Sequence, residues 1–239
     1  MRASILLWGL FCGLGQLWSQ QTLSPEQALT QMQERMNRLQ EVELKVNYRI
    51  YEGHSSSNLV EEKSAIYRRE KKAYSLDFGE MQIFCRGKEY LHIDHDQGMI
   101  FYGTDVDDTQ MQLAPVSVSQ LLKVASKSTM EEGPSILKVR LHFQTLPTAD
   151  LQQVDYIIDK QSLLLMSVVL YYRRASLPMM PSAPALTTPR LEISYKLLPK
   201  SNKPIPFPVD TYLSLGSAKP RLQSPYQHFQ LQLLDHPKQ

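Results

Sequence analysis

The sequence has few of the residues that define a disulfide-bonded or cysteine-rich metal-binding protein. Only two of its 239 residues are cysteines, Cys12 and Cys85. Two cysteines exclude both a framework of several disulfides and a zinc site built from several cysteines. The net charge is also small, because the sequence has 26 lysines and arginines and 24 acidic residues, which gives a formal net charge of +2. This balance argues against a large electrostatic surface for nucleic acid, so we expect no nucleic-acid partner.

Local signatures of catalysis are missing as well. The sequence contains no G-x-S-x-G, H-E-x-x-H, P-loop or dinucleotide-binding motif. The best metal candidate is His92, Asp94 and His95, of which the first two share one face of a predicted strand. The alternative, a solvated hairpin turn at 96–98, is the preferred interpretation. We therefore expect no enzyme, no metal and no cofactor. A hydrolase or metal enzyme would require these three side chains to converge in a pocket.

The sequence has no hydrophobic run of the roughly 20 residues needed to span a bilayer. The run from Ile5 to Trp18 is shorter, follows a basic start and ends before a polar segment, which is typical of a secretory signal peptide. We predict a signal peptide over 1–20. Cys12 lies inside this run without small residues directly before it, so a lipid anchor is disfavoured. The mature chain would keep only Cys85, as a buried structural thiol. A lone cysteine suits a bacterial periplasm at least as well as an extracellular space, and we expect secretion across the inner membrane into the periplasm of a Gram-negative envelope.

Two helices are predicted. Ser24 is a favourable N-cap, Pro25 suits the first helical position and Gln27 completes a capping box. Apolar residues then recur at helical spacing, which predicts an amphipathic helix over about 25–40. A second, short helix is predicted over 116–125.

Most of the remaining chain is predicted to form strands joined by short turns. Apolar and polar residues alternate over 43–50, which is typical of a strand with one dry and one wet face. Similar segments follow at about 60–70, 72–78, 81–86, 89–94, 99–102, 137–143, 154–158, 163–174, 191–198, 209–215 and 226–234. We predict a mainly β (α+β) fold, a curved antiparallel sheet or incomplete β-barrel of about ten or eleven strands. The two helices would cover its concave face, and residues 21–239 would form a single domain.

Large apolar and aromatic residues are concentrated on one face of the predicted sheet. Such a face is either filled by the covering helices or kept partly open as a binding cavity, and the pattern alone does not separate these possibilities. The candidate lipid-binding residues are those on this face: Leu44, Val46, Tyr48, Ile50, Tyr67, Tyr74, Leu76, Phe78, Leu141, Phe143, Ile193 and Tyr195.

Proline is concentrated in the last part of the chain. A Pro/Met-rich loop at 177–190 is apolar, yet its prolines suit neither a helix nor a central strand. It is either an insertion laid against the sheet or a mobile lip beside a cavity. The pattern leaves both interpretations open.

Several segments occur in an order shared with a known family. They are the signal peptide, the N-terminal helix, the alternating strand at 42–51, the strand 87–94 with its Gly-Lys, aromatic and Asp residues, the Leu-Ala-Pro of 113–115 before Leu121-Leu122, and the late hairpin over 154–172. In this order they resemble the bacterial lipoprotein-carrier family, LolA and LolB, over roughly residues 24–200.

The resemblance implies an unclosed antiparallel barrel with a helical lid and a hydrophobic cavity. The function it implies is a periplasmic carrier that binds lipid, or the acyl chains of lipoproteins, by transferring apolar surface from water into the cavity. Envelope membrane proteins are candidate partners. The alternative is a non-catalytic envelope interaction or scaffold protein on the same fold with a filled core.

Overall fold

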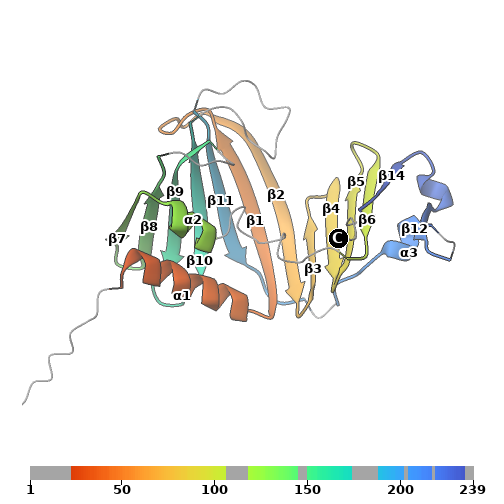
Figure 1. Ribbon diagram of the computed structural model, residues 1–239, viewed down its shortest axis with the longest axis horizontal. Coiled ribbons are helices and arrows are strands. Elements are labelled where there is room, and N and C mark those ends of the chain that lie inside the picture. The colour runs from red at the N-terminus through yellow and green to blue at the C-terminus, as the bar shows by residue number, and fades with distance from the viewer. Residues whose placement is uncertain are drawn as a thin grey trace, which may run out of the picture.

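A twelve-stranded sheet runs the length of the molecule in the computed structural model (Figure 1). The structure describes residues 23–105, 118–144, 150–173, 188–201, 204–216 and 219–234. The predicted signal peptide and most of the Pro/Met-rich loop at 177–190 lie outside these residues.

The elements follow one another as one long series of strands interrupted by short helices. The helices are α1 (Pro25–Arg38), α2 (Val118–Val124), α3 (Val209–Tyr212) and the 3-10 turn η2 (Ser224–Tyr226). The strands of the large sheet are β1 (Glu41–Tyr51), β2 (Leu59–Glu70), β3 (Ala73–Asp77), β4 (Met81–Arg86), β5 (Glu89–Asp94), β6 (Met99–Gly103), β7 (Lys127–Glu132), β8 (Ile136–His142), β9 (Leu151–Asp159), β10 (Leu165–Tyr172), β11 (Arg190–Leu197) and β14 (Gln230–Leu233). Strands β12 (Leu213–Ser214) and β13 (Arg221–Leu222) form a separate small hairpin.

The large sheet is open. Its order is β14-β6-β5-β4-β3-β2-β1-β11-β10-β9-β8-β7, so β14 and β7 are its two edges. Every neighbouring pair is antiparallel except β14 and β6, which are parallel. The mainly β, open and mostly antiparallel architecture predicted from the sequence is confirmed, with a parallel pair at one edge that the sequence did not predict.

Helix α1 begins as the sequence predicts. The Gln27 backbone N–H donates to the Ser24 hydroxyl at 3.2 Å, and the Ser24 N–H donates to the Gln27 side-chain oxygen at 2.9 Å. This reciprocal pair is a complete capping box, with Pro25 at the first helical position. The helix ends at Arg38, slightly before the predicted position 40, because β1 already begins at Glu41.

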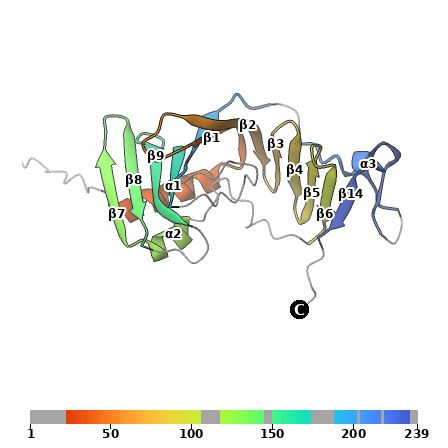
Figure 2. The same ribbon diagram turned by 90° about the horizontal axis from the view of Figure 1, so that it is seen from above.

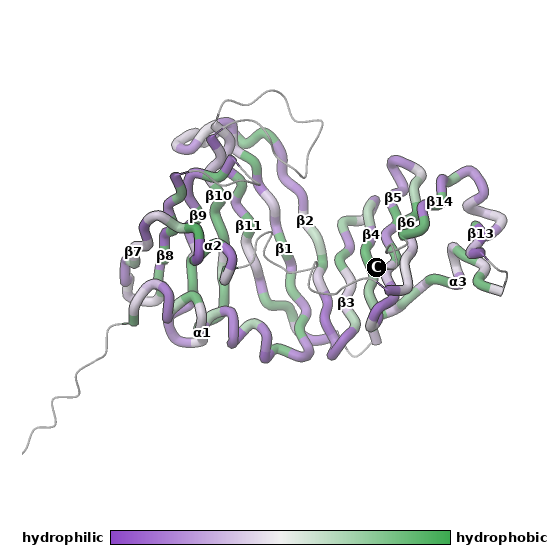
Figure 3. The backbone as a smooth tube through the Cα atoms, viewed as in Figure 1, coloured by the Kyte–Doolittle hydropathy of each residue, from purple (hydrophilic) through white to green (hydrophobic). Residues whose placement is uncertain are grey.

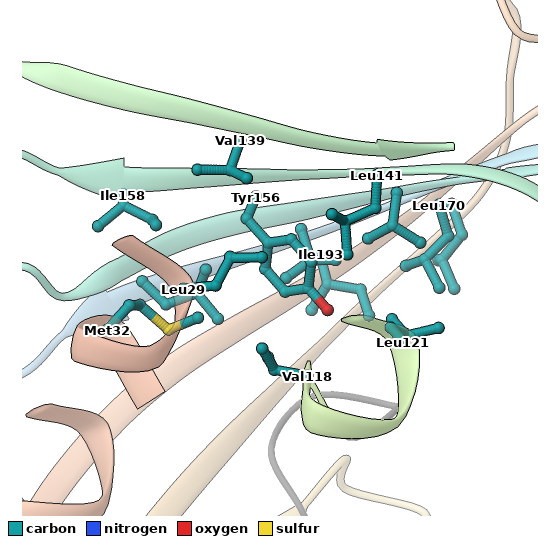
Figure 4. Packing of buried hydrophobic residues seen from close by; sticks show 14 of the residues in the cluster. Leu29, Met32, Val118, Leu121, Val139, Leu141, Tyr156, Ile158, Leu170 and Ile193 are labelled. Atoms are coloured by element: carbon teal, nitrogen blue, oxygen red, sulfur yellow. The ribbon is translucent and has the colours of Figure 1, made fainter. Parts of the chain in front are cut away.

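Both longer helices pack on one face of the sheet, which we call the helix face (Figure 2). Leu29 and Met32 of α1 and Leu121 of α2 are buried against apolar side chains of β1, β2 and β8 to β11. Figure 4 shows these side chains, with Val118, Tyr156 and Ile193, filling the space between helices and strands. The main core therefore lies beneath α1 and α2. Figures 1 and 2 show that neither helix extends over β4 to β6.

The opposite face, which we call the outer face, is polar over the same strands. Hydrophobic and hydrophilic residues alternate along β1 and β11 (Figure 3). On the outer face Arg49 pairs with Glu62 at 2.7 Å, and Arg68 pairs with Glu43 at 3.3 Å. The two faces thus separate apolar from charged residues, as the predicted period of two requires.

A second core lies on the outer face of β4 to β6. It contains Phe84, Leu91, Ile93, Ile100 and Tyr102, which are buried by residues from the end of the chain. The covering part, which we call the C-terminal unit, consists of residues 204–216 and 219–234. Its main buried contributors are Val209, Tyr212 and Leu213. Strands β4 to β6 therefore have apolar residues on both faces.

The structure corrects three element predictions. Residues 209–215 were expected to form a strand, but they form α3 and the two-residue β12, because Val209 and Tyr212, three positions apart, both point into the second core. In 226–234 only Gln230–Leu233 is a strand. Strand β7 was not predicted, since Lys127–Glu132 is a polar edge strand whose single large apolar residue, Met130, packs against the main core.

Candidate functional site

The helix face continues as an apolar surface beyond the two helices. In the strand register, Tyr67 lies opposite Leu76, Leu76 opposite Ile83, and Ile83 opposite His92. Because directly paired residues share a face, the row continues from the main core across β3 to β6. We call the side chains of this extension the aromatic strip: Tyr74, Leu76, Ile83, Tyr90, His92 and Phe101.

The twelve predicted lipid-binding residues fall into two groups. Seven are buried in the main core: Leu44, Val46, Ile50, Tyr67, Leu141, Phe143 and Ile193. The other five are half-buried: Tyr48, Tyr74, Leu76, Phe78 and Tyr195. The register places every strand member of the set on the helix face, and Phe78 reaches it from the turn after β3. The second group and the aromatic strip, apart from the buried Tyr90, form the more exposed part of this face.

Ring contacts connect the half-buried residues to one another. The Tyr48 and Phe78 ring centroids are 5.5 Å apart, and Tyr67 stacks on Tyr74 at 6.4 Å. At the far side of the strip, His92 stacks on Phe101 at 5.0 Å. These separations are in the range in which aromatic rings attract one another, and the aliphatic Leu76 and Ile83 lie between Tyr67 and His92 in the register.

The strip carries no phenolate charge at neutral pH. Burial raises the pKa of Tyr48, Tyr67 and Tyr90 to about 12 in each case. The pKa of Tyr74 is raised further, mainly by burial and then by the neighbouring Cys85 thiol. Burial lowers the pKa of His92, against the opposing effect of Asp94, and so favours its neutral ring. An apolar ligand therefore meets neutral side chains along the strip.

The metal candidate is not assembled into one site. His92 and Asp94 belong to the helix face. The His95 ring instead lies against Phe229 and Tyr212 of the C-terminal unit, with centroids 5.8 Å and 6.2 Å away. Over the described ranges, the structure brings no three His, Cys, Asp or Glu side chains together as a group that could hold a metal ion.

The lipid-binding residues predicted from the sequence did not include Ile83, Tyr90 and Phe101, and His92 was predicted only as a metal ligand. A signal for them was present. The turn at Gly87 pairs Arg86 with Glu89 and therefore Cys85 with Tyr90, and counting by twos from Cys85 and Tyr90 places Ile83 and His92 on one face. Following the period of two through each hairpin turn would have found the strip.

None of the helices in the described part of the chain combines the length and hydrophobicity required to cross a membrane.

No protein-family model matches the sequence, and no curated protein sequence does. Solved structures do match. An uncharacterized conserved protein from Thermus thermophilus matches with a TM-score of 0.41 and 9% identity, over 77% of this chain and 92% of that one. Lipoprotein LppX from Mycobacterium tuberculosis matches with a TM-score of 0.39 and 12% identity, over 76% and 97%. A LolA superfamily protein from Nitrosomonas europaea matches with a TM-score of 0.30 and 8% identity, over 77% and 96%.

Proposed function

We propose that this protein binds lipid, or the acyl chains of lipoproteins, along the helix face of its sheet and carries them through the periplasm. The observation that supports this most directly is the continuity of one apolar face. It is sealed by α1 and α2 over the main core and continues over β3 to β6 as aromatic and aliphatic side chains that are half-buried, except for the buried Tyr90.

The mechanism is binding rather than catalysis. An acyl chain laid on the strip gains about 0.8 kcal/mol for each methylene removed from water, so a few methylenes give substantial affinity. The half-buried group Tyr48, Leu76, Phe78 and Tyr195 connects the strip to the main core. Movement of α1 and α2 would extend the binding surface into that core, which is how a lid would control uptake and release.

A matched pair of substitutions tests the location of the site. Ile83 and Ile66 are both half-buried strand residues, but Ile83 lies on the helix face and Ile66 on the outer face. We expect Ile83→Asn to weaken binding of a fluorescent fatty acid by about tenfold or more, because it replaces an aliphatic contact by an amide. Ile66→Asn should leave binding within about twofold. Equal effects of the two variants would contradict the assignment.

Native mass spectrometry of protein purified without detergent tests the function itself. Bound phospholipid or acylated peptide supports the carrier proposal. A clean mass of the protein alone, with no uptake of fluorescent fatty acid, refutes it.

The alternative, an envelope interaction or scaffold protein, has its own supporting observation. Leu29, Val139, Leu141 and Ile193 are completely inaccessible to solvent, so the main core is filled by the protein's own side chains. If no lipid binds, this filled core favours the scaffold function, and the aromatic strip then becomes the surface to test for a protein partner.

A further inference from the structure

One cation occupies an unusual position at the end of the helix face. Arg69 of β2 lies directly opposite Tyr74, and Tyr74 lies opposite Cys85, in the row next to the β2–β3 turn. Arg69 is half-buried. Burial raises the pKa of Tyr67 to about 12, and the nearby charge of Arg69 partly opposes that rise. The Arg69 charge therefore acts on Tyr67, and the register places Arg69 beside Tyr74 on the same face, where the aromatic strip begins.

Arg69 differs from neighbouring cations that have a counter-ion. Arg68 pairs with Glu43 at 3.3 Å, Arg86 with Glu89 at 3.1 Å, and Lys200 with Glu41. No ion pair or hydrogen bond joins the Arg69 side chain to any residue in the described segments. A half-buried guanidinium has lost part of its hydration, and an anion would compensate for that loss.

A second polar group beside Arg69 also has unused hydrogen-bonding capacity. The Tyr74 hydroxyl is buried with the Cys85 thiol as its hydrogen-bonding neighbour, and within the residues that the structure describes no oxygen or nitrogen atom is bonded to it. Buried hydroxyls are normally hydrogen-bonded, because burial without a partner is costly. A guanidinium and a phenol at directly paired positions on one face are donors suited to a carboxylate or phosphate oxygen.

The remaining charges indicate which end of the strip suits an anion. Asp94 lies on the helix face at the opposite end of β5, in the row of Met81 and Met99. Its carboxylate would repel an anionic group there. Lys71, in the turn that follows Arg69, adds a second positive charge at this end, where its backbone N–H donates to the Gln40 carbonyl at 2.7 Å. Glu41 and Glu70 pair at the same end but belong to the outer face, and the pKa of Glu41 is lowered mainly by Lys200 and also by the Lys71 charge.

We propose that Arg69 and Tyr74 bind the anionic head group, a carboxylate or phosphate, of an amphiphile whose hydrocarbon chain lies along the aromatic strip. This inference rests on the proposed function and specifies its ligand as an anionic lipid. A single lipid molecule fits better than an anionic bilayer surface, because Arg69 is half-buried within the apolar row, whereas a bilayer needs only exposed charges such as that of Lys71.

The experiment compares two probes that differ only in head-group charge: dansyl-labelled undecanoic acid and its methyl ester. Each is titrated into delipidated wild-type protein and into Arg69→Gln, Tyr74→Phe and Arg68→Gln. The last is the matched control, since Arg68 is the next residue on the same strand but lies on the outer face. Inorganic phosphate alone, and vesicles of neutral or anionic phospholipid, are the remaining arms.

We expect wild-type protein to bind the acid about tenfold or more tightly than the ester, in line with a charge-assisted hydrogen bond. Arg69→Gln should remove most of this preference while leaving the ester affinity unchanged, and Tyr74→Phe should reduce it by a smaller factor. Arg68→Gln should retain it. If Arg69→Gln does not fold, the ratio of acid to ester affinity in wild-type protein and in Tyr74→Phe still tests the head-group site.

The results that would overturn the head-group site differ from those that would refute the proposed function. Equal affinity of wild-type protein for acid and ester overturns the head-group site but leaves the proposed function intact, whereas no binding of either probe refutes the proposed function. Phosphate that binds by itself, and is lost in Arg69→Gln, would identify a free-anion site and overturn the assignment to an amphiphile. Loss of anionic-vesicle binding in Arg69→Gln, with unchanged affinity for the acid, would assign Arg69 to a bilayer surface instead.

Discussion

Replacing Leu29 by alanine tests whether α1 is part of the permanent core. Leu29 is inaccessible to solvent, between α1 and the helix face. The change removes about three methylene equivalents at roughly 0.8 kcal/mol each, and the cavity left behind adds a further cost. We expect the free energy of unfolding to fall by about 3–4 kcal/mol. For a domain of this size that corresponds to a decrease in Tm of about 10 °C.

Urea unfolding followed by circular dichroism measures this difference. Leu197→Ala is the matched control, because the same substitution is made on a side chain that is 61% exposed. It should change the free energy of unfolding by no more than about 0.5 kcal/mol. If Leu29→Ala were as mild as the control, α1 would not be packed on the sheet in solution. The reasoning that treats the region beneath it as a filled core would then be refuted.

Three further predictions follow from the described contacts. His92 has a lowered pKa in the folded state, so the unfolded state binds more protons, and stability should fall as the pH decreases from above about 6.5 through the folded-state value. His92→Gln should flatten that decline in urea titrations at several pH values, and an unchanged slope would contradict this. Asp155→Asn removes the partner of Lys138 at 2.8 Å and Arg140 at 3.1 Å, with an expected cost of about 1–3 kcal/mol in thermal unfolding. A cost near zero would show that the buried pairs contribute nothing. Leu213→Ala opens the second core and should speed proteolysis of the C-terminal unit while hydrogen exchange in α1 stays unchanged. Faster hydrogen exchange in α1 as well as faster proteolysis of the C-terminal unit would indicate that the two cores unfold as one cooperative unit.

Local patterns predicted most of the sheet. The strand over 43–50 and the hairpins at 81–86 and 89–94 were placed correctly, because strict alternation and turn glycines are local signals. Gly87 has a φ of 65°, a conformation that favours glycine, so the residue type itself marks the turn.

The sequence predictions that were wrong or missing concern elements whose structure depends on contacts between residues distant in the chain. The segment 209–215 is short and apolar, so its period does not separate a strand from a helical turn, and packing against β4 to β6 decides the outcome. The parallel pairing of β14 with β6 joins segments more than a hundred residues apart, and a local pattern carries no information about it.

The sequence predicted which face of the sheet carries the candidate site, but not how much of that face the helices leave uncovered. Alternation placed Leu44, Tyr74 and Leu141 on the same side of the sheet. Which of them α1 and α2 cover depends on where the helices lie across the strands. The sequence therefore indicated the apolar surface, and the arrangement in space separated the filled core from the aromatic strip.

The second core has a consequence for the order of events during synthesis. The outer face of β4 to β6 is covered by residues from 204 onward, which are the last of the described residues to be made. At about 5–20 residues per second, roughly ten seconds pass between translation of β6 and of β14. During that interval Leu91, Ile93 and Ile100 have no partner from the C-terminal unit. A nascent chain at this stage displays a surface that chaperones recognise, and a prematurely terminated chain would display it permanently. Burial of this surface therefore depends on synthesis of the C-terminal unit.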